Sequence, residues 1–202
     1  VQADPTRVLN MRPLVRSQVF DMIDKAALPV ALTQTQKDKT FRLCDGHPLA
    51  TSYLIGILVG TSELSAVDAI LDNANPYQGH VDQGYEIYWQ GIQQNTALRE
   101  LLALLARLRI AFNPLELVSW SDEATARSLV QEAGFYFYKE TRHSWRFFHN
   151  SFRQFILNRT SLNFLDEPDV TRDRAYHAKL ADLAAKLPND NPQSREVLYH
   201  LG

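Results

Sequence analysis

The chain has 202 residues, of which 45% are hydrophobic and 22% are charged, and its formal net charge is −2. This apolar content is sufficient for one or two domains with hydrophobic cores. The near-neutral charge argues against non-specific nucleic-acid binding, which needs a basic excess. The single cysteine, Cys44, excludes an internal disulfide and a zinc site built on cysteines. Because the sequence has neither an apolar run of about 18 residues nor a signal-peptide pattern, we expect a cytoplasmic protein without membrane contact.

The first residues look like the end of a preceding domain. Residues 7–12 resemble a short strand followed by Pro13, a piece that would join a sheet built elsewhere. We therefore expect residues 1–12 to belong to a domain that this chain does not otherwise contain, and the chain to be part of a larger protein.

Residues 13–74 are predicted to form a small bundle of four short helices. In the first helix, one stripe is apolar and consists of Val15, Val19, Met22 and Ile23. Thr33 is a suitable N-cap for a second helix that reaches Cys44. Cys44 lies on the apolar side of that helix, so we expect it to be inert packing.

A corner that contains a glycine and a proline follows the second helix, in the run Gly46-His47-Pro48-Leu49. Glycine can adopt the positive φ that ends a helix, and proline suits the first turn of the next one. We expect a third helix from this corner to about Val59, and a fourth helix, capped by Thr61 or Ser62, that continues through Leu71.

Residues 79–160, which follow a linker rich in turn-forming residues, are predicted to form a winged-helix domain with one β-hairpin. Apolar periodicity places its first helices at 81–93, 98–108, 114–120 and 122–133. In the last of these, the residues expected to face inward are Ala126, Leu129, Val130 and Ala133. Two aromatic strands are expected at 135–139 and 144–148, and a further helix begins at Ser151.

The helix at 122–133 occupies the position of a DNA-recognition helix, but its charge is wrong for that role. It carries three acidic residues and one arginine, Arg127, whereas a helix in the major groove needs the reverse balance. Arg142, His143 and Arg146 on the hairpin are too few for strong phosphate binding. We therefore expect the winged helix to pack against protein and not to bind DNA.

Residues 169–202 are predicted to form a helical hairpin. Asp169 or Thr171 would cap its first helix, and its second helix is expected at 194–200. Such a hairpin is typical of the start of an α-solenoid. His177 and His200 have no companions in a known ligand pattern, so the sequence predicts no metal site.

His149 lies where the second strand gives way to a helix, in the run Phe147-Phe148-His149-Asn150-Ser151-Phe152. At such a junction the ring is close to free backbone amides and to the positive end of the helix, a common setting for anions. The alternative interpretation is that the histidine caps the helix or fills a core.

Together and in this order, the Gly46-His47-Pro48-Leu49 corner and the His149 motif resemble the STAND class of signal-transducing ATPases, the NACHT and NB-ARC proteins. The resemblance covers residues 1–165, and residues 147–152 are similar to the NACHT form of the histidine motif. It implies that 1–12 end a nucleotide-binding domain, 13–74 form the helical lid, 79–160 form the winged helix and 169–202 begin a helical repeat region.

The resemblance also implies a role for the two motifs. In that class the proline contacts the adenine of the nucleotide, and the histidine reaches the β-phosphate of ADP and holds the closed state. Residues Gly46, His47, Pro48, Leu49 and His149 would thus bind ADP or ATP, with Mg²⁺ in the full-length protein. The implied partners are the preceding nucleotide-binding domain, further copies of the protein after activation, and a trigger ligand or protein sensed by the repeats. Bacterial defence, regulated cell death and transcription control are the implied settings.

The sequence contains no Gly-x-x-x-x-Gly-Lys-Ser/Thr loop and no apolar strand that ends in an acidic pair able to hold Mg²⁺. We therefore expect no catalytic residue, no ATPase activity and at most weak nucleotide binding from this chain, although the parent protein would be a slow ATPase. Two alternatives remain open: a winged-helix DNA-binding or protein-interaction module without nucleotide, and a solenoid scaffold.

Overall fold

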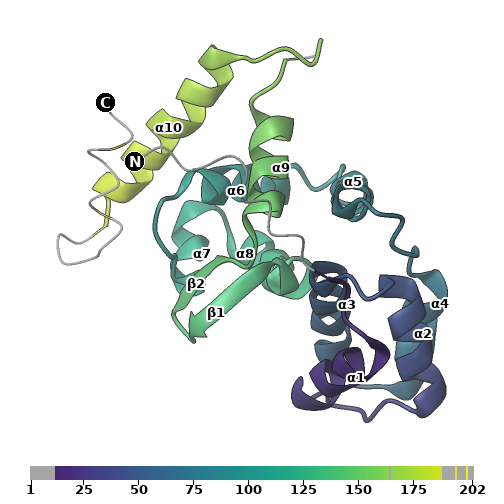
Figure 1. Cartoon of the computed structure of the whole chain (residues 1–202). Coiled ribbons are helices and arrows are strands. Elements are labelled where there is room, and N and C mark those ends of the chain that lie inside the picture. Colours follow the sequence, from purple (N-terminus) through teal and green to yellow (C-terminus); the bar gives the residue numbers. More distant parts are fainter. Residues whose placement is uncertain (1–11, 164, 188–193, 195–198, 200–202) are drawn as a thin grey trace, which may run out of the picture. The chain divides into compact units, whose positions relative to one another are not determined.

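The computed structural model describes residues 12–163, 165–187, 194 and 199. Within these residues the chain is mainly helical and has a single two-stranded antiparallel hairpin, so the predicted fold class is confirmed (Figure 1). The chain divides into two compact units, a first unit that ends at Val81 and a second unit that begins at Asp82. The strand expected at 7–12 and the second helix expected at 194–200 lie largely outside the described residues.

The first unit is a bundle of four helices, α1 (Arg16–Lys25), α2 (Gln34–Cys44), α3 (Pro48–Val59) and α4 (Leu64–Asn73). Helix α2 contacts each of the other three. It begins as predicted, because the Thr33 side chain accepts a hydrogen bond from the Gln36 amide. The Gln36 side chain also donates to Asp68 of α4 over 2.7 Å, which links the two helices.

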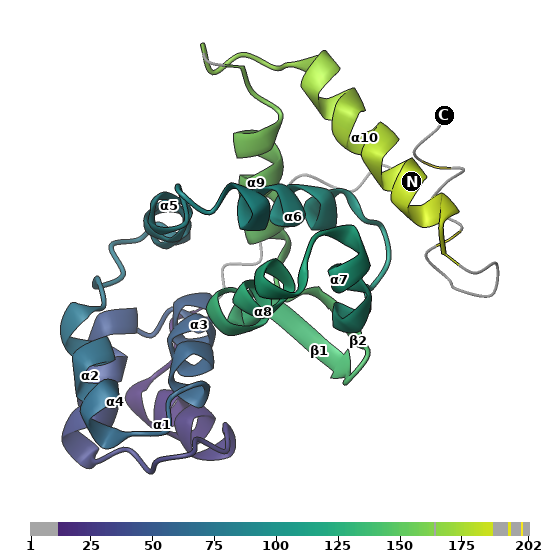
Figure 2. The same ribbon diagram turned by 180° about the vertical axis from the view of Figure 1, so that it is seen from behind.

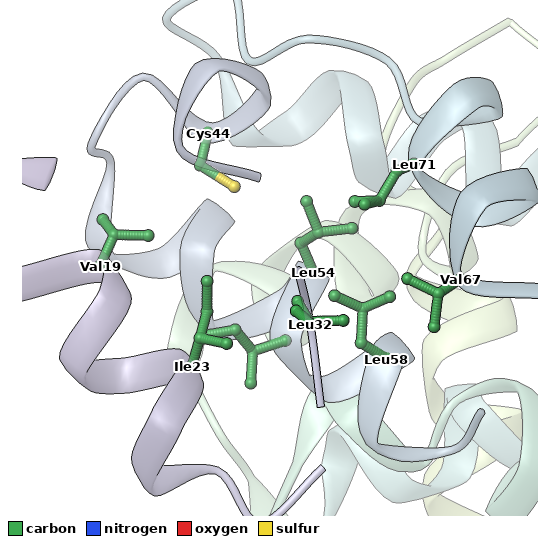
Figure 3. Close-up of a cluster of buried hydrophobic side chains, with 9 residues drawn as sticks. Val19, Ile23, Leu32, Cys44, Leu54, Leu58, Val67 and Leu71 are labelled. Atoms are coloured by element: carbon green, nitrogen blue, oxygen red, sulfur yellow. The ribbon is translucent and has the colours of Figure 1, made fainter. Parts of the chain in front are cut away.

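The core of the first unit is almost entirely aliphatic (Figure 3). Its buried members are Val19, Ile23, Leu32, Cys44, Leu54, Ile55, Leu58, Val67 and Leu71. Cys44 is buried as expected, and burial raises the pKa of its thiol to about 11, which keeps the sulfur protonated and unreactive.

Two details of the first unit were predicted wrongly. Val15 is 59% exposed, because it is the extended N-cap residue of α1 and lies outside the helical stripe. The N-cap of α4 is Glu63 and neither Thr61 nor Ser62. The Thr61 hydroxyl donates instead to the Ile57 carbonyl of α3, so it satisfies the end of one helix and not the start of the next.

The second unit contains the remaining elements. Its helices are α5 (Val81–Gly91), α6 (Thr96–Arg107), α7 (Leu117–Trp120), α8 (Glu123–Glu132), α9 (Asn150–Thr160) and α10 (Val170–Ala185), with short 3₁₀ helices η1 (Pro114–Glu116) and η2 (Gly134–Tyr136). Helix α6 contacts α8, α9 and α10 (Figure 2). Almost every residue of α6 from Leu98 onward is buried, so this helix is the centre of the unit.

The hairpin consists of β1 (Phe137–Thr141) and β2 (Ser144–Phe147), paired antiparallel. Phe112, between α6 and α7, adds a third, one-residue strand, because it exchanges two backbone hydrogen bonds of 2.8 Å with Trp145 of β2. In chain order, α6 is thus followed by this short strand, by α7 and α8 and by the hairpin.

The structure also corrects two expectations in the second unit. Phe135 and Tyr136 belong to η2 and not to the first strand, because this turn places the Tyr136 ring in a stacked contact with Phe152, with 3.7 Å between centroids. Val130 of α8 is 41% exposed and does not face inward.

The core of the second unit combines aliphatic residues with aromatic side chains, among which Tyr85, Tyr136 and Phe152 are all buried. The Tyr85 ring lies against both of the others, with centroid distances of 5.9 Å to Tyr136 and 5.0 Å to Phe152. Burial raises the pKa of the Tyr136 and Tyr88 hydroxyls, so both stay protonated.

A buried arginine joins three helices of this unit. Arg107, at the end of α6, is only 3% exposed. Its guanidinium donates to the hydroxyls of Thr160 and Ser161 at the end of α9, at 3.0 and 2.8 Å. It also donates to Asp173 of α10, at 2.9 and 2.7 Å. The charge is therefore fully hydrogen-bonded, which is the condition under which a buried arginine is tolerated.

Candidate functional site

The corner at Gly46 is fixed by its backbone. Gly46 has φ of +66°, and a Cβ at this position would lie 2.3 Å from the carbonyl oxygen of Leu14. The Gly46 carbonyl in turn accepts a 2.7 Å hydrogen bond from the Leu14 amide. Both the positive φ and the close approach require glycine, so the prediction that Gly46 ends the helix through a positive φ is confirmed.

His47 and Pro48 start the next helix. Pro48 is the first residue of α3, as predicted, and His47 is its N-cap, with Nδ1 accepting a 3.3 Å hydrogen bond from the Ala50 amide. The His47 ring also stacks on Tyr77, with 4.4 Å between centroids. The Tyr77 amide donates to the carbonyl of Leu43 over 2.6 Å, which ties the segment after α4 to the corner. Pro48 and Leu49 are both half-buried.

His149 forms a second corner, in the second unit. It is the N-cap of α9, and its Nδ1 accepts a 3.1 Å hydrogen bond from the Ser151 amide. The Ser151 hydroxyl lies 2.8 Å from the same nitrogen and 2.7 Å from the hydroxyl of the buried Tyr85.

The contact with the Ser151 amide determines which ring nitrogen of His149 carries the proton. An amide nitrogen can only donate, so Nδ1 of His149 must be unprotonated and the neutral ring must carry its proton on Nε2. The Ser151 hydroxyl lies within hydrogen-bond distance of both Nδ1 and the Tyr85 hydroxyl. The His149 side chain is exposed, and within the described residues its Nε2 has no hydrogen-bond partner. The corner therefore offers one oriented N–H donor to the solvent.

The predicted residues thus lie in two corners, one in each unit. Gly46, His47, Pro48 and Leu49 form the first, and His149 belongs to the second. The sequence did not identify Tyr77, Tyr85 or Ser151 as their partners. Of these, only Ser151 carried a local signal, since a hydroxyl residue in the first helical turn often bonds to a neighbouring cap residue.

Helix α8 carries the acidic excess that the sequence indicated. Arg127 is engaged by Glu123, with 2.6 Å between Nη2 and Oε1. The Thr125 amide donates to Asp122 at the start of the helix and holds the pKa of that carboxyl below its usual range, so this end remains negative. An acidic surface of this kind repels nucleic-acid phosphates.

The described residues contain no group of three or more histidine, cysteine, aspartate or glutamate side chains arranged to hold a metal ion. In the same part of the chain, no helix combines the length and apolar character needed to cross a bilayer.

Comparison with protein-family models, with curated protein sequences and with solved structures finds no match to this chain.

Proposed function

We propose that this chain is the regulatory part of a STAND-type nucleotide-dependent switch. In this role the Gly46-His47-Pro48-Leu49 corner contacts the adenine of ADP, and His149 donates to its β-phosphate. Both corners would complete a site whose phosphate loop and Mg²⁺ ligands belong to a preceding nucleotide-binding domain. Exchange of ADP for ATP would release the winged helix and allow copies of the protein to assemble and signal.

The observation that carries the proposal is the orientation of His149. Its Nδ1 is occupied by the Ser151 amide and hydroxyl, so the exposed Nε2 presents a hydrogen-bond donor. A hydrogen bond from such a donor to a charged phosphate contributes about 1.5–3 kcal/mol. This energy would shift the ratio of closed to open molecules by roughly ten- to a hundredfold, which is sufficient for a switch.

The first corner supports the same proposal in a different way. Gly46 cannot take a side chain without a clash with Leu14, and it places Pro48 at the beginning of α3. A rigid, half-buried proline offers a flat apolar face to a base. The acidic start of α8 and the Arg127–Glu123 pair disfavour the alternative of a DNA-binding winged helix.

The test separates a nucleotide contact from simple helix capping. It uses the natural protein that carries this chain together with a nucleotide-binding domain, and it compares His149→Ala with His149→Asn. Asparagine is a strong N-cap that can accept from the Ser151 amide, but it does not reproduce the Nε2 donor. We expect both variants to release ADP about ten- to a hundredfold faster than the wild type, measured with a fluorescent ADP analogue, and to assemble more readily.

His143→Ala serves as the matched control, because His143 is an exposed histidine on the hairpin turn. It should leave ADP release unchanged. If His149→Asn released ADP at the wild-type rate while His149→Ala lost both stability and nucleotide, His149 would act only as a helix cap and the proposal would be wrong.

A further inference from the structure

A cavity of about 690 Å³ opens on the second unit, apart from the two corners. It is bounded by the end of α6 and the segment that follows, by the hairpin and by the first turn of α9. Three buried apolar residues line it, Leu105, Leu108 and Phe112. His149 is not among the lining residues. The volume lies within the range of sites that hold small molecules.

The polar lining of this cavity is strongly positive. Among the described residues, three arginines contribute to it, Arg109, Arg146 and Arg153, against a single acidic residue, Glu140. Glu140 is already paired with Arg146, with 2.8 Å between Oε1 and Nη2. The described part of the lining thus has a formal charge of +2, in a chain whose net charge is −2. A concave surface with such an excess concentrates anions.

Arg153 is held in position for an anion. Its Nε donates a 2.7 Å hydrogen bond to the carbonyl of Ala106 in the last turn of α6, and its side chain is half-buried. Among the described residues, its two terminal amino groups have no hydrogen-bond partner. A guanidinium fixed through Nε keeps both terminal groups available for two oxygens of a phosphate or a carboxylate.

Arg109 is ordered by a different contact. Its guanidinium lies over the ring of Tyr199, 4.3 Å from the centroid, in a contact made by the flat face of the guanidinium. We propose that the cavity binds a small organic anion, in which a phosphate or carboxylate group meets Arg109 and Arg153 and an apolar body lies against Leu108 and Phe112.

The test measures binding to the whole chain by titration calorimetry with four probes: 1-naphthyl phosphate, 1-naphthoate, 1-naphthol and inorganic phosphate. We expect 1-naphthyl phosphate or 1-naphthoate to bind at least about tenfold more tightly than naphthol or inorganic phosphate, because only these two probes engage both the arginines and the apolar wall. The ratio of their affinities identifies which anionic group the site prefers. Raising the salt concentration should weaken binding of the charged probes.

Two variants locate the site. Arg153→Gln and Arg109→Gln should each weaken binding of the preferred probe by about tenfold or more, as expected for loss of a charge-assisted contact. Arg153→Lys should restore part of the affinity, since lysine keeps the charge but not the planar fork. Arg127→Gln is the control, because Arg127 is an exposed arginine of α8 outside the cavity, and it should bind the probes as the wild type does.

Arg109 is exposed, so the Arg109→Gln variant should fold even if the Arg153→Gln variant does not. Circular dichroism shows whether each variant is folded. Absence of measurable binding for both charged aromatic probes would overturn the proposal. Unchanged affinity for the preferred probe in a folded Arg109→Gln variant would also overturn it.

Discussion

In the first unit the turn before α3 is dictated by the backbone, whereas in the second unit the turn before α9 is held by side chains. Gly46 adopts a left-handed conformation against the Leu14 carbonyl, and no other residue fits there without strain. His149 has an ordinary extended backbone and caps its helix through Nδ1. The first corner therefore depends on the identity of one residue, while the second depends on a hydrogen-bonding group that several residues can supply.

The interiors of the two units differ in a similar way. The first unit is stabilised by an aliphatic cluster, which is non-directional and tolerates substitutions that conserve volume. The second unit adds buried aromatic rings and the buried Arg107 to its aliphatic residues, and the hydrogen bonds of Arg107 reach α9 and α10. Directional contacts specify geometry more strictly, but each one that is broken leaves a polar group without its partner.

The largest effect is expected at the backbone-determined corner. Gly46→Ala should lower the free energy of unfolding by about 2–5 kcal/mol, because alanine meets both the penalty of a left-handed backbone and the clash with Leu14. Denaturant unfolding measures the loss. Gly84→Ala is the control, since a Cβ at Gly84 in α5 has open space around it, and helix propensity predicts a gain of up to about 1 kcal/mol there. An equal response of the two variants would contradict the role assigned to Gly46.

A smaller effect is expected where α10 meets Arg107. Burial raises the pKa of the Asp173 carboxyl, but the hydrogen bond and charge of Arg107, together with smaller contributions that include the Ser161 hydrogen bond, outweigh burial and set the pKa below its ordinary value. The carboxylate therefore stabilises the folded state above an unfolded pKa of about 3.9, and this contribution is lost as the pH falls through the lower folded pKa. Because the side chain is 39% exposed, we expect Asp173→Asn to cost only about 1 kcal/mol at pH 7.

Urea unfolding of wild type and Asp173→Asn between pH 7 and pH 2 tests this expectation. The difference between the two proteins should be constant near neutrality and should shrink towards zero as the pH falls below about 3.9. Asp182→Asn, at an exposed position of the same helix, should show little difference at any pH. A difference between wild type and Asp173→Asn that grew on acidification would contradict the assignment.

The smallest effect is expected at the corner held by side chains. His149→Ala should lower the free energy of unfolding by about 1 kcal/mol through loss of the N-cap, and His149→Asn should restore most of it. His47→Asn should remain less stable than the wild type, because asparagine can replace the N-cap but not the stacking of the His47 ring on Tyr77. Thermal unfolding of these three variants compares the two caps directly. Equal stability of His47→Asn and wild type would show that the ring contact contributes nothing.

The local features of this chain could be predicted because short-range physics determines them. Thr33, Asp122 and Asp169 cap their helices as expected, since the cap and the amide it accepts from lie within three residues of each other. The positive φ of Gly46 and the position of Pro48 follow from the same local rules. The burial of α6 was evident from its apolar periodicity.

The partners of the candidate site residues depend on long-range packing. Tyr77 lies under His47, and Tyr85 reaches Ser151 beside His149, although neither contact has a sequence pattern. The short strand at Phe112 and the η2 turn at Tyr136 also depend on neighbours, because Phe112 pairs with Trp145 and Tyr136 stacks on Phe152.

The helices, several of their caps, the single hairpin and the two corners could be predicted from the sequence, because propensity and periodicity act over a few residues. The contact of Tyr85 with Ser151, the burial of Arg107 and the convergence of three arginines on one cavity depend on tertiary packing. Each of these joins residues far apart in the chain, and their proximity is set by how the helices pack and not by any local preference.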